Sequence, residues 1–498
     1  MRLSARALGH LPAEVVRPTW DRSSTRVGVV HVGLGGFARA HLAVYLDRLL
    51  AGNDSREQGQ DAQQWGICGV GLLPADERMR EVLRAQDHLY TVLTKAPDGD
   101  LEARVVGAVV DYLFAPDDPD AVVERMADPD VRIVSLTVTE GGYGLDPVTG
   151  EFDADTPGVR DDLQPGATPR TVFGLVTEAL LRRRDRGIEP FTVLSCDNLP
   201  GNGTIARRSF GAFARLRDEA AGQWLDSAVR FPNSMVDRIT PGTTDDDRSL
   251  LRDRFGIEDD WPVVCEPFSQ WVIEDAFGDG RPSVEEVGAQ VVDDVGPYEL
   301  MKLRLLNAGH QTLGYLGLLA GYRTVDEAAD DADLARLLEQ YLELEATPTL
   351  DPVPGVDLAD YRRTLLERFR NPGVRDTLAR LCVDSSERMP KFVLPVVAAR
   401  LEAGTDLRRA ALVVAAWARW AEGVDEQGGE LTMTDPRADA LRAAAARQRE
   451  DPLAFVANRE LFGDLADDPR FTEPYMEALR SLHDDGVRTT LKRFTAPS

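Results

Sequence analysis

The stretch VGVVHVGLGGFA, from Val27 to Ala38, decides the fold because it joins a short apolar run to a G-x-G-x-x-A pattern. The run from Val27 to Val32 is rich in β-branched residues, which predicts a buried strand. Four apolar residues follow the glycines at helical spacing: Leu42, Tyr45, Leu46 and Leu49. A strand, a glycine-rich turn and a helix in this order are typical of a dinucleotide-binding βαβ unit.

Each position of the glycine-rich turn has its own physical role. Gly33 permits the tight turn, Gly35 lets the backbone approach a pyrophosphate, and the small Ala38 lets the helix pack closely on the strand. The N–H groups at the start of the helix then face the anion. We predict cofactor contacts from six residues of this turn: Gly33, Leu34, Gly35, Gly36, Phe37 and Arg39. The alternative is a plain tight turn, because a chain with 42 glycines contains such triplets by chance.

Strand-like and helix-like segments alternate from Val27 to about Asp294, which is typical of a parallel sheet covered by helices, an α/β fold of Rossmann type. The predicted strands are Val27–Val32, Trp65–Leu72, Val131–Thr139 and Phe191–Cys196. Helical spacing dominates after Gly296-Pro297, most clearly in Tyr298–Leu319, Asp333–Leu344, Leu358–Phe369, Leu407–Glu422 and Pro436–Arg449. We therefore predict an NAD-binding domain over residues 1–294 and a mainly α-helical substrate and catalytic domain over residues 295–498.

A carboxylate after the second predicted strand indicates which dinucleotide binds. Asp76 lies just beyond Trp65–Leu72, where an acidic side chain can bind the ribose hydroxyls and repel a 2′-phosphate. NAD is thus favoured over NADP. Asp76 lies farther beyond Gly35 than the usual ~20 residues, and we interpret the polar stretch from Gly52 to Gln64 as a loop insertion that accounts for most of the difference.

Composition excludes several other classes of function. The chain has 498 residues, with 57 Lys and Arg against 84 Asp and Glu, and its net charge of −27 disfavours binding to nucleic acid or to anionic membranes. The four cysteines are scattered in apolar runs, and no apolar stretch reaches the ~18 residues of a membrane span, so we expect a cytoplasmic protein. The histidines and cysteines show no metal-ligand spacing, so we predict no metal site.

A second segment carries groups suited to chemistry on an alcohol. Oxidation of a carbinol needs a base for the hydroxyl proton and donors for the developing alkoxide. The run KLRLLNAGH offers Lys302, Asn307 and His310 within nine residues. In a regular helix at 100° per residue, Glu299 lies at about 60°, His310 at about 80° and Asn307 at about 140° from Lys302. These side chains would share one side of the helix.

Two further considerations bear on this assignment. A lysine with the ordinary pKa of ~10.4 costs roughly 4.6 kcal/mol to deprotonate at pH 7, so a lysine base must be desolvated or lie near positive charge such as the nicotinamide cation. Asn198 follows the strand Phe191–Cys196 and could pair with Asn307 as a second donor. The alternatives are an exposed lysine on an ordinary helix and a turn or cap asparagine before Pro200. Tyr298 forms a Tyr-x-x-x-Lys pair with Lys302, but we assign it a structural role.

Taken together, these motifs resemble the long-chain, polyol-specific dehydrogenases, the mannitol dehydrogenase family. The resemblance covers nearly the whole chain and rests on the following stretches: GLGGFARAH (33–41), SLTVTEGGY (135–143), SCDN (195–198), FPNSMVDRITP (231–241), VCEPFSQWVIED (264–275) and the Lys-x4-Asn-x2-His of 302–310.

The resemblance implies an N-terminal Rossmann-type domain, a mainly helical C-terminal domain, a cleft between them and a mechanism without metal. It further implies Lys302 as acid/base, Asn198 and Asn307 as holders of the reacting oxygen, and His310 as a substrate ligand that orients the lysine. Asp237, Arg380 and Arg388 match positions expected to contact the polyol, although lysine is expected at the last. Asp76 matches the ribose-binding aspartate, and Ala75 stands where some members have a second carboxylate. The family includes monomers, so a monomer is among the expected states.

For function, the resemblance implies NAD-dependent oxidation of D-mannitol at C2 to D-fructose and the reverse reduction. Glu299, one turn before Lys302, is a candidate proton relay on its spacing alone. Within the family, fructuronate or tagaturonate reductase and D-arabinitol or D-sorbitol dehydrogenase are alternative activities. An alternative of another class is a noncatalytic NAD-binding sensor, which the presence of Lys302, Asn307 and His310 argues against.

Overall fold

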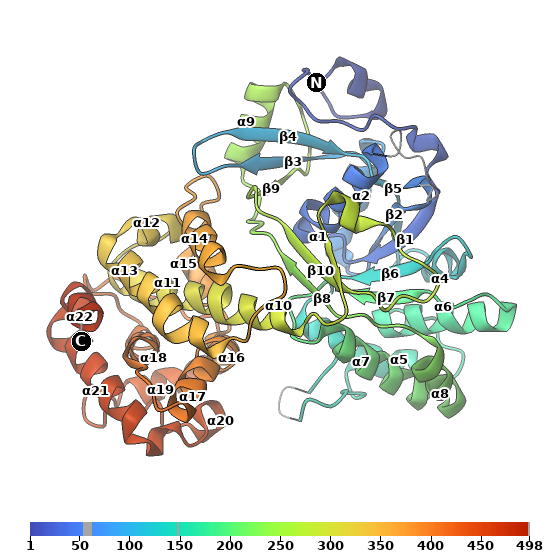
Figure 1. Cartoon of the computed structure of the whole chain (residues 1–498). Coiled ribbons are helices and arrows are strands. Elements are labelled where there is room, and N and C mark those ends of the chain that lie inside the picture. The colour runs from blue at the N-terminus through green and yellow to red at the C-terminus, as the bar shows by residue number, and fades with distance from the viewer. Residues whose placement is uncertain (53–61, 147–148, 497–498) are drawn as a thin grey trace. The chain divides into compact units, whose positions relative to one another are not determined.

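The computed structural model describes residues 1–52, 62–146 and 149–496 (Figure 1). The chain forms two compact units, Met1–Gly296 and Pro297–Ser498. Most of the predicted loop insertion from Gly52 to Gln64 lies outside the described residues, and its last three residues, Ala62–Gln64, form a 3-10 turn.

The first unit contains a five-stranded parallel sheet with the spatial order β5-β2-β1-β6-β7. Its strands, in chain order, are β1 (Val27–Val32), β2 (Gly66–Gly71), β5 (Val109–Phe114), β6 (Ile133–Leu136) and β7 (Thr192–Ser195). The four strands predicted from the sequence are therefore present, three of them shorter than predicted. The edge strand β5 was not predicted, because half of its residues are only partly buried and its apolar run is interrupted.

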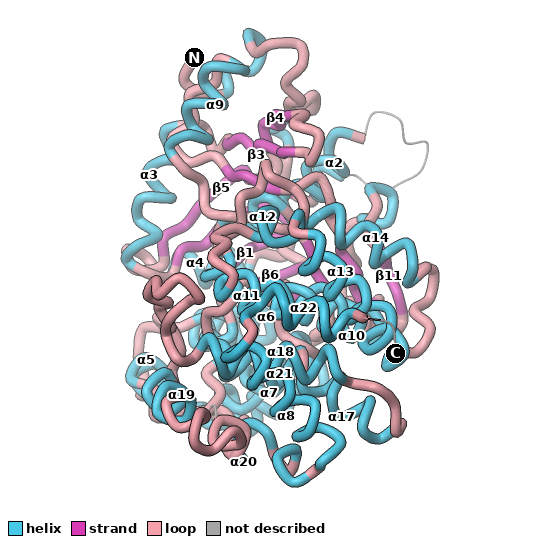
Figure 2. The backbone as a smooth tube through the Cα atoms, turned by 90° about the vertical axis from the view of Figure 1, so that its left-hand side faces the viewer, coloured by secondary structure: helices cyan, strands magenta, loops and turns pink. Residues whose placement is uncertain are grey.

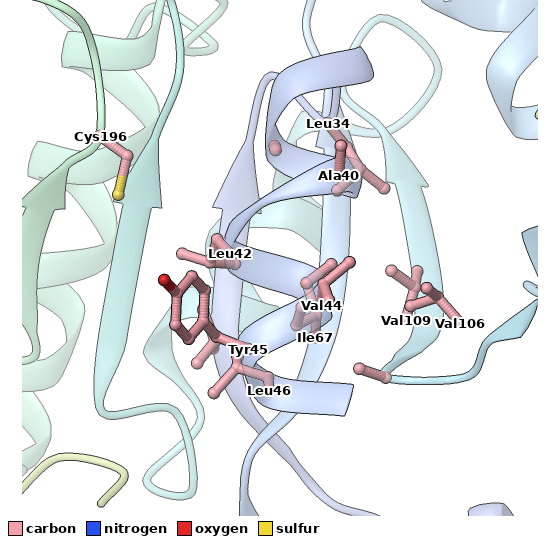
Figure 3. Packing of buried hydrophobic residues seen from close by; sticks show 14 of the residues in the cluster. Leu34, Ala40, Leu42, Val44, Tyr45, Leu46, Ile67, Val106, Val109 and Cys196 are labelled. Atoms are coloured by element: carbon pink, nitrogen blue, oxygen red, sulfur yellow. The ribbon is translucent and has the colours of Figure 1, made fainter. Parts of the chain in front are cut away.

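The faces of this sheet carry separate hydrophobic clusters. Val29 belongs to one cluster, and Val30 and Val32 belong to the other. Because successive side chains of a strand point to opposite faces, β1 is buried on both sides, as expected for a parallel sheet covered by helices. Figure 3 shows part of the first cluster, where Val44 lies beside Ile67 of β2 and Leu42 and Leu46 lie beside Tyr45.

Helices cover the sheet and follow most of its strands. They are α1 (Gly36–Ala40), α2 (Leu42–Ala51), α3 (Glu77–Ala85), α4 (Pro119–Ala127), α5 (Pro157–Asp162), α6 (Val172–Arg186), α7 (Asn202–Arg217) and α8 (Glu219–Ala228). A further helix of this unit, α9 (Asp245–Phe255), shares a separate hydrophobic cluster with Leu93 and Ala103. The Rossmann-type fold class is confirmed for this unit.

Two smaller sheets depart from the all-parallel pattern. The remaining strands are β3 (Tyr90–Lys95), β4 (Leu101–Val106), β8 (Ser234–Asp237), β9 (Val263–Cys265), β10 (Gln270–Glu274) and β11 (Gln290–Val292). They form the sheets β4-β3-β9 and β11-β10-β8. Each sheet has one antiparallel pair, β3 with β4 and β8 with β10. The first unit is therefore a Rossmann-type sheet with two mixed additions.

The second unit is helical, and none of its residues up to 496 lies in a strand of a sheet (Figure 2). After α10 (Gly296–Met301), which begins at the boundary, its helices are η8 (Lys302–Asn307), α11 (Ala308–Leu319), α12 (Val325–Asp330), α13 (Ala332–Gln340), η9 (Tyr341–Ala346), α14 (Leu358–Phe369), α15 (Leu378–Leu381), α16 (Ser385–Phe392), α17 (Leu394–Glu402), α18 (Arg408–Trp420), α19 (Ala438–Ala445), α20 (Arg459–Phe462), α21 (Pro469–Asp484) and α22 (Gly486–Thr495).

The core of the second unit is formed by α11 and α18. Nearly every residue of these two helices is buried. A helix that is buried all round lies at the centre of its domain, so the other helices of the unit pack around this pair. Because α11 follows η8 directly, the segment from Lys302 to His310 begins at the edge of this core and continues into it.

One local prediction for this segment is wrong. The sequence predicts one regular helix over Tyr298–Leu319, but η8 is a π-helical turn between α10 and α11. A π turn closes i→i+5 hydrogen bonds and holds more residues than an α turn, so each residue advances by less than 100°. The angles calculated for Glu299, Asn307 and His310 relative to Lys302 therefore do not apply.

Among the described residues, no helix combines the length and the apolar character that a membrane crossing requires.

Candidate active site

The glycine-rich turn after β1 contains one position, residue 33, that only glycine can occupy. Gly33 has φ +86°, and a Cβ there would lie 2.2 Å from the Thr137 carbonyl oxygen. Its N–H donates to the Val70 carbonyl at 3.0 Å, and its own carbonyl accepts from the Gly35 N–H at 2.6 Å. The tight turn expected at Gly33 is present, and the backbone from Leu34 to Gly36 is held against the ends of β1 and β2.

The turn presents backbone donors, although the helix after it is short. No described residue accepts a hydrogen bond from the Leu34 N–H, and Gly35 is the N-cap of α1 without a side-chain cap. The helix α1 ends after Ala40, and His41, with φ −114° and ψ −91°, separates it from α2. The spacing predicted one helix after the turn, but the structure has two, α1 and α2. The backbone N–H donors therefore belong to the turn and to the short helix α1.

The Arg39 side chain points into the protein. It is 2% exposed, its Nη1 donates to the Trp261 carbonyl at 2.6 Å, and its guanidinium lies 5.2 Å from the centre of the Tyr90 ring. The Tyr90 hydroxyl in turn donates to the Arg39 carbonyl at 2.8 Å. This guanidinium anchors α1 to the strand β3, so a cofactor contact of Arg39 stays a prediction.

Asp76 lies at the carboxyl end of the strand β2 in an arrangement that keeps one oxygen available. Its Oδ2 accepts from the N–H groups of Leu72 and Leu73, each at 2.9 Å. Its Oδ1 accepts no hydrogen bond from the described residues. The two backbone bonds fix the carboxylate beside the end of the strand, in the place where a ribose diol binds in such folds.

Asn198 is exposed just after β7, and the residue before it is tightly held. The buried Asp197 carboxylate accepts from the N–H groups of Val138 and Thr139, at 3.1 and 2.9 Å, and from the Tyr143 hydroxyl at 2.7 Å. Burial raises the pKa of Asp197, and these hydrogen bonds oppose the rise. The loop that carries Asn198 is thereby fixed to the loop after β6.

Asp237 ends β8 and is 3% exposed. The next residue, Arg238, is also buried and donates from its guanidinium to the Glu266 carbonyl at 2.9 and 3.1 Å and to the Ala40 carbonyl at 2.6 Å. Arg238 thus ties the end of β8, next to Asp237, to the end of α1.

In the second unit, Lys302 and Asn307 begin and end the π turn η8, and both residues are 8% exposed. The Asn307 amide nitrogen is buried and has no hydrogen-bond partner among the described residues. His310 follows on the first turn of α11, with its ring 4.6 Å from that of Phe369. A buried amide donor without a partner costs free energy, typically about 1–3 kcal/mol, and such groups are common where a ligand supplies the partner.

The residues just before the π turn differ in environment. The Tyr298 hydroxyl donates to the Pro354 carbonyl at 2.7 Å, which agrees with a structural role, and burial raises its pKa. Glu299 is half-buried on α10, one turn before Lys302.

The two arginines predicted to contact substrate are held in different ways. Arg380 donates from Nε to the buried Asp376 carboxylate at 2.6 Å and from Nη2 to its other oxygen, and this pairing raises the pKa of Arg380. Its side chain is still 53% exposed. Arg388 donates from Nη1 to the carbonyls of Arg380 and Leu381, at 3.2 and 3.1 Å. Arg388 therefore holds the backbone from which Arg380 projects.

No group of three or more His, Cys, Asp or Glu side chains that could hold a metal ion occurs in the described parts of the chain.

Comparison with known proteins assigns both units. Residues 27–286 match the family model described as the mannitol dehydrogenase Rossmann domain, and residues 294–483 match the mannitol dehydrogenase C-terminal domain. The chain belongs to the mannitol dehydrogenase family. Together the two matches cover most of its length, so the family prediction made from the sequence motifs is confirmed.

Relatives in the mannitol dehydrogenase family match from end to end. The chain is 44% identical over 503 residues to mannitol 2-dehydrogenase of Pyricularia oryzae, with 99% of each chain covered. It is 44% identical, with a TM-score of 0.88 and 99% of each chain covered, to the solved ternary complex of Pseudomonas fluorescens mannitol 2-dehydrogenase with NAD and D-mannitol. It is 38% identical, with a TM-score of 0.91, to a substrate-free D-sorbitol dehydrogenase, covering 99% of this chain and all of that one.

Sequence reasoning missed three buried polar residues of the first unit that lie next to its candidate site residues: His31, Asp197 and Arg238. Asp197 and Arg238 lie inside motifs that were recognised, but neither was given a role. The signal for His31 was available, because a histidine in the middle of an otherwise apolar strand needs polar partners in the fold.

Proposed function

We propose that the protein catalyses the NAD-dependent oxidation of D-mannitol at C2 to D-fructose, and the reverse reduction, with Lys302 as acid/base. The observation that carries the proposal is the end-to-end similarity to a relative whose solved structure holds NAD and D-mannitol, at 44% identity over 99% of each chain. Such similarity over nearly the full length of both chains supports a shared reaction as well as a shared fold.

The residues of the first unit fit a dinucleotide. The close approach at Gly33, the Leu34 N–H and the available Oδ1 of Asp76 match a pyrophosphate and a ribose in the order that this fold requires. When bound, NAD supplies the hydride acceptor. We assign its contacts to Gly33, Leu34, Gly35, Gly36, Phe37 and Asp76. For Arg39 we assign a contact from its backbone and not from its side chain.

The residues of the second unit fit the proton chemistry. Lys302 is buried, and its amine is the group of this segment that can take up and release the proton of an alcohol. We propose that its Nζ takes the C2 hydroxyl proton. The Asn307 amide nitrogen, which lacks a partner among the described residues, would donate to the reacting oxygen together with Asn198. His310 would bind a neighbouring hydroxyl and orient the lysine.

The remaining polar residues would hold and serve the polyol. We propose that Asp237, Arg380 and Arg388 position the polyol chain, with Arg388 acting through the backbone of residues 380 and 381.

Glu299 would pass the proton between Lys302 and solvent. Glu299→Gln should slow polyol oxidation at low pH more than at high pH, and an unchanged pH–rate profile would remove Glu299 from the mechanism.

Turnover measured by NADH absorbance tests the function directly. The enzyme is offered D-mannitol, D-sorbitol, D-arabinitol, fructuronate and tagaturonate, the last two with NADH. We expect the highest kcat/KM with D-mannitol. D-Sorbitol is the second candidate, since the D-sorbitol dehydrogenase structure has the higher TM-score of the two relatives. Turnover of a hexuronate alone would contradict the proposal, and NAD binding without turnover of any compound would favour a sensor.

We further propose that residues 1–294 form the NAD-binding domain and residues 295–498 the substrate and catalytic domain. This division is supported by the limits of the two family models and of the two compact units. We also propose a cytoplasmic monomer that takes a small-molecule polyol or ketose as substrate and binds neither nucleic acid nor membranes. The four cysteines are all buried thiols, which suits a reducing compartment. Light scattering after size-exclusion chromatography tests the oligomeric state.

A further inference from the structure

A buried histidine lies directly behind the glycine-rich turn. His31, in β1, has no exposed surface, and both of its ring nitrogens are hydrogen-bonded to hydroxyls of the segment that contains β6. Nδ1 lies 2.8 Å from the Ser135 Oγ, and Nε2 lies 2.9 Å from the Thr137 Oγ1. The Thr137 hydroxyl lies 2.7 Å from the Gly33 carbonyl oxygen. Three side chains thus link the interior of the sheet to the turn.

Donor and acceptor roles in this chain of bonds have one consistent assignment for a neutral ring. The Gly33 carbonyl can only accept, so the Thr137 hydroxyl donates its proton to it. The Thr137 oxygen then accepts from Nε2–H, and Nδ1, which carries no proton, accepts from the Ser135 hydroxyl. Burial lowers the pKa of His31 to about 4, so the ring is neutral near pH 7.

These hydrogen bonds join β1 to the segment of β6 at the place in the sheet where ligands of such folds bind. The spatial order β5-β2-β1-β6-β7 reverses direction between β1 and β6. Ligands of open α/β sheets bind outside the carboxyl ends of the strands at such a reversal. Gly33 follows β1 and Thr137 follows β6, so the bond between them lies at that position.

The direction of the Gly33 carbonyl also sets the direction of the Leu34 N–H, because both belong to one peptide unit. In a trans peptide the C=O and the N–H point in opposite directions. The Gly33 carbonyl is held toward Thr137 and toward the Gly35 N–H. The N–H of the same peptide unit, which belongs to Leu34, therefore points the other way, and no described residue accepts a hydrogen bond from it.

We propose that His31 and Thr137 are positioning residues for the dinucleotide, because their hydrogen bonds fix the Gly33 carbonyl and so aim the Leu34 N–H at the pyrophosphate. This inference rests on the proposed function, since it requires NAD as the ligand. Thr137 makes the decisive contact, and His31 and Ser135 keep the Thr137 hydroxyl turned toward Gly33.

Conservative variants of Thr137 separate this role from general stability. Thr137→Val keeps the shape and removes the hydroxyl, whereas Thr137→Ser keeps the hydroxyl. Thr177→Val is the matched control, because Thr177 is a buried threonine of α6 whose hydroxyl has no partner among the described residues. The readouts are the Kd of NAD from calorimetry, kcat and KM for each substrate, and Tm.

We expect Thr137→Val to raise the Kd and KM of NAD about fivefold to tenfold, because the Leu34 N–H would no longer be aimed at the pyrophosphate and one hydrogen bond to the cofactor would be weakened. Its kcat at saturating NAD and its KM for D-mannitol should stay within about twofold of wild type. Thr137→Ser and Thr177→Val should bind NAD as wild type does. Ser135→Ala, which removes only the bond to Nδ1, should raise the Kd of NAD by less than Thr137→Val, and it serves as the test if Thr137→Val does not fold.

Two results would overturn the inference while leaving the function intact. One is wild-type NAD affinity in folded Thr137→Val, or in Ser135→Ala when that variant is the only one that folds. The other is a Thr137→Ser variant that binds as weakly as Thr137→Val. If wild-type protein binds no NAD, the proposed function fails, and this inference fails with it.

Discussion

The glycine-rich turn and the Lys302 segment present functional groups in contrasting ways. The turn offers backbone groups, and their directions are set by a glycine with φ +86° and by buried bonds from neighbouring strands. The Lys302 segment offers side chains from a π turn. Their directions depend on the angle by which each residue of that turn advances, which is smaller than in an α-helix. Changes in the turn should therefore alter cofactor binding, whereas changes in the segment should alter the chemical step.

The largest expected effect is that of Lys302→Ala. Removing the general base should lower kcat for D-mannitol oxidation about 10³-fold, within the range for a positioned acid/base. The Kd of NAD should stay near wild type, because the turn is untouched. Stopped-flow NADH formation and calorimetry measure the two quantities. Near-normal oxidation by this variant would exclude Lys302 as the base.

Asn307→Asp tests the buried amide. The change keeps the shape of the side chain and replaces the donor nitrogen, which lacks a partner among the described residues, with an acceptor. We expect kcat to fall about 10²-fold, as for loss of one preorganised donor. The effect should appear in kcat more than in the KM of NAD. A variant with wild-type kcat would show that the amide does not contact the reacting oxygen.

Gly33→Ala tests the turn, and Gly99→Ala is its control. Gly99 has nearly the same φ, +89°, but a Cβ there meets nothing within 4 Å, whereas at Gly33 it would meet the Thr137 carbonyl. Both changes should cost about 1 kcal/mol or more of stability from backbone strain. Only Gly33→Ala should raise the KM of NAD, by roughly tenfold or more, because the turn must move. Equal cofactor kinetics in the two variants would contradict this assignment.

Asp76→Ala should lower kcat/KM for NAD by about tenfold, the effect of losing a charge-assisted hydrogen bond. Activity with NADP should fall less or rise, because the carboxylate that opposes a 2′-phosphate is gone. Ala75→Glu adds a carboxylate beside Asp76 and should sharpen the preference for NAD. Steady-state kinetics with both cofactors compare the three proteins, and an unchanged NAD-to-NADP ratio in Asp76→Ala would exclude a ribose contact.

The smallest expected effect concerns pH and stability. Burial lowers the pKa of His31 from 6.5 to about 4, so the folded protein binds fewer protons than the unfolded chain between these values. The contribution of His31 to the free energy of unfolding is complete above pH 6.5 and falls as the pH drops toward 4. Chemical denaturation at several pH values should show a weaker decline for His31→Gln than for wild type.

The predicted sequence motifs differ in how much of their geometry could be foreseen. The turn at Gly33 follows from a local pattern, since a residue with positive φ and no room for a Cβ must be glycine. The orientation of Arg39 does not, because its partners Trp261 and Tyr90 are distant in the sequence. The π turn at Lys302 was missed because the apolar spacing of Tyr298–Leu319 was interpreted as one regular α-helix, and that spacing does not reveal a single i→i+5 turn within it.

The sequence by itself determined the family, the order of strand, turn and helix at Val27–Ala38, and the candidate chemistry at Lys302, Asn307 and His310. These features depend on residue types at short, fixed spacings. The tertiary structure alone decided that His31, Ser135 and Thr137 connect to Gly33, that Asp197 fixes the loop of Asn198, and that a π turn carries Lys302. The physical reason is that buried polar groups must be paired after the chain has folded, and their partners come from strands and loops far apart in the sequence.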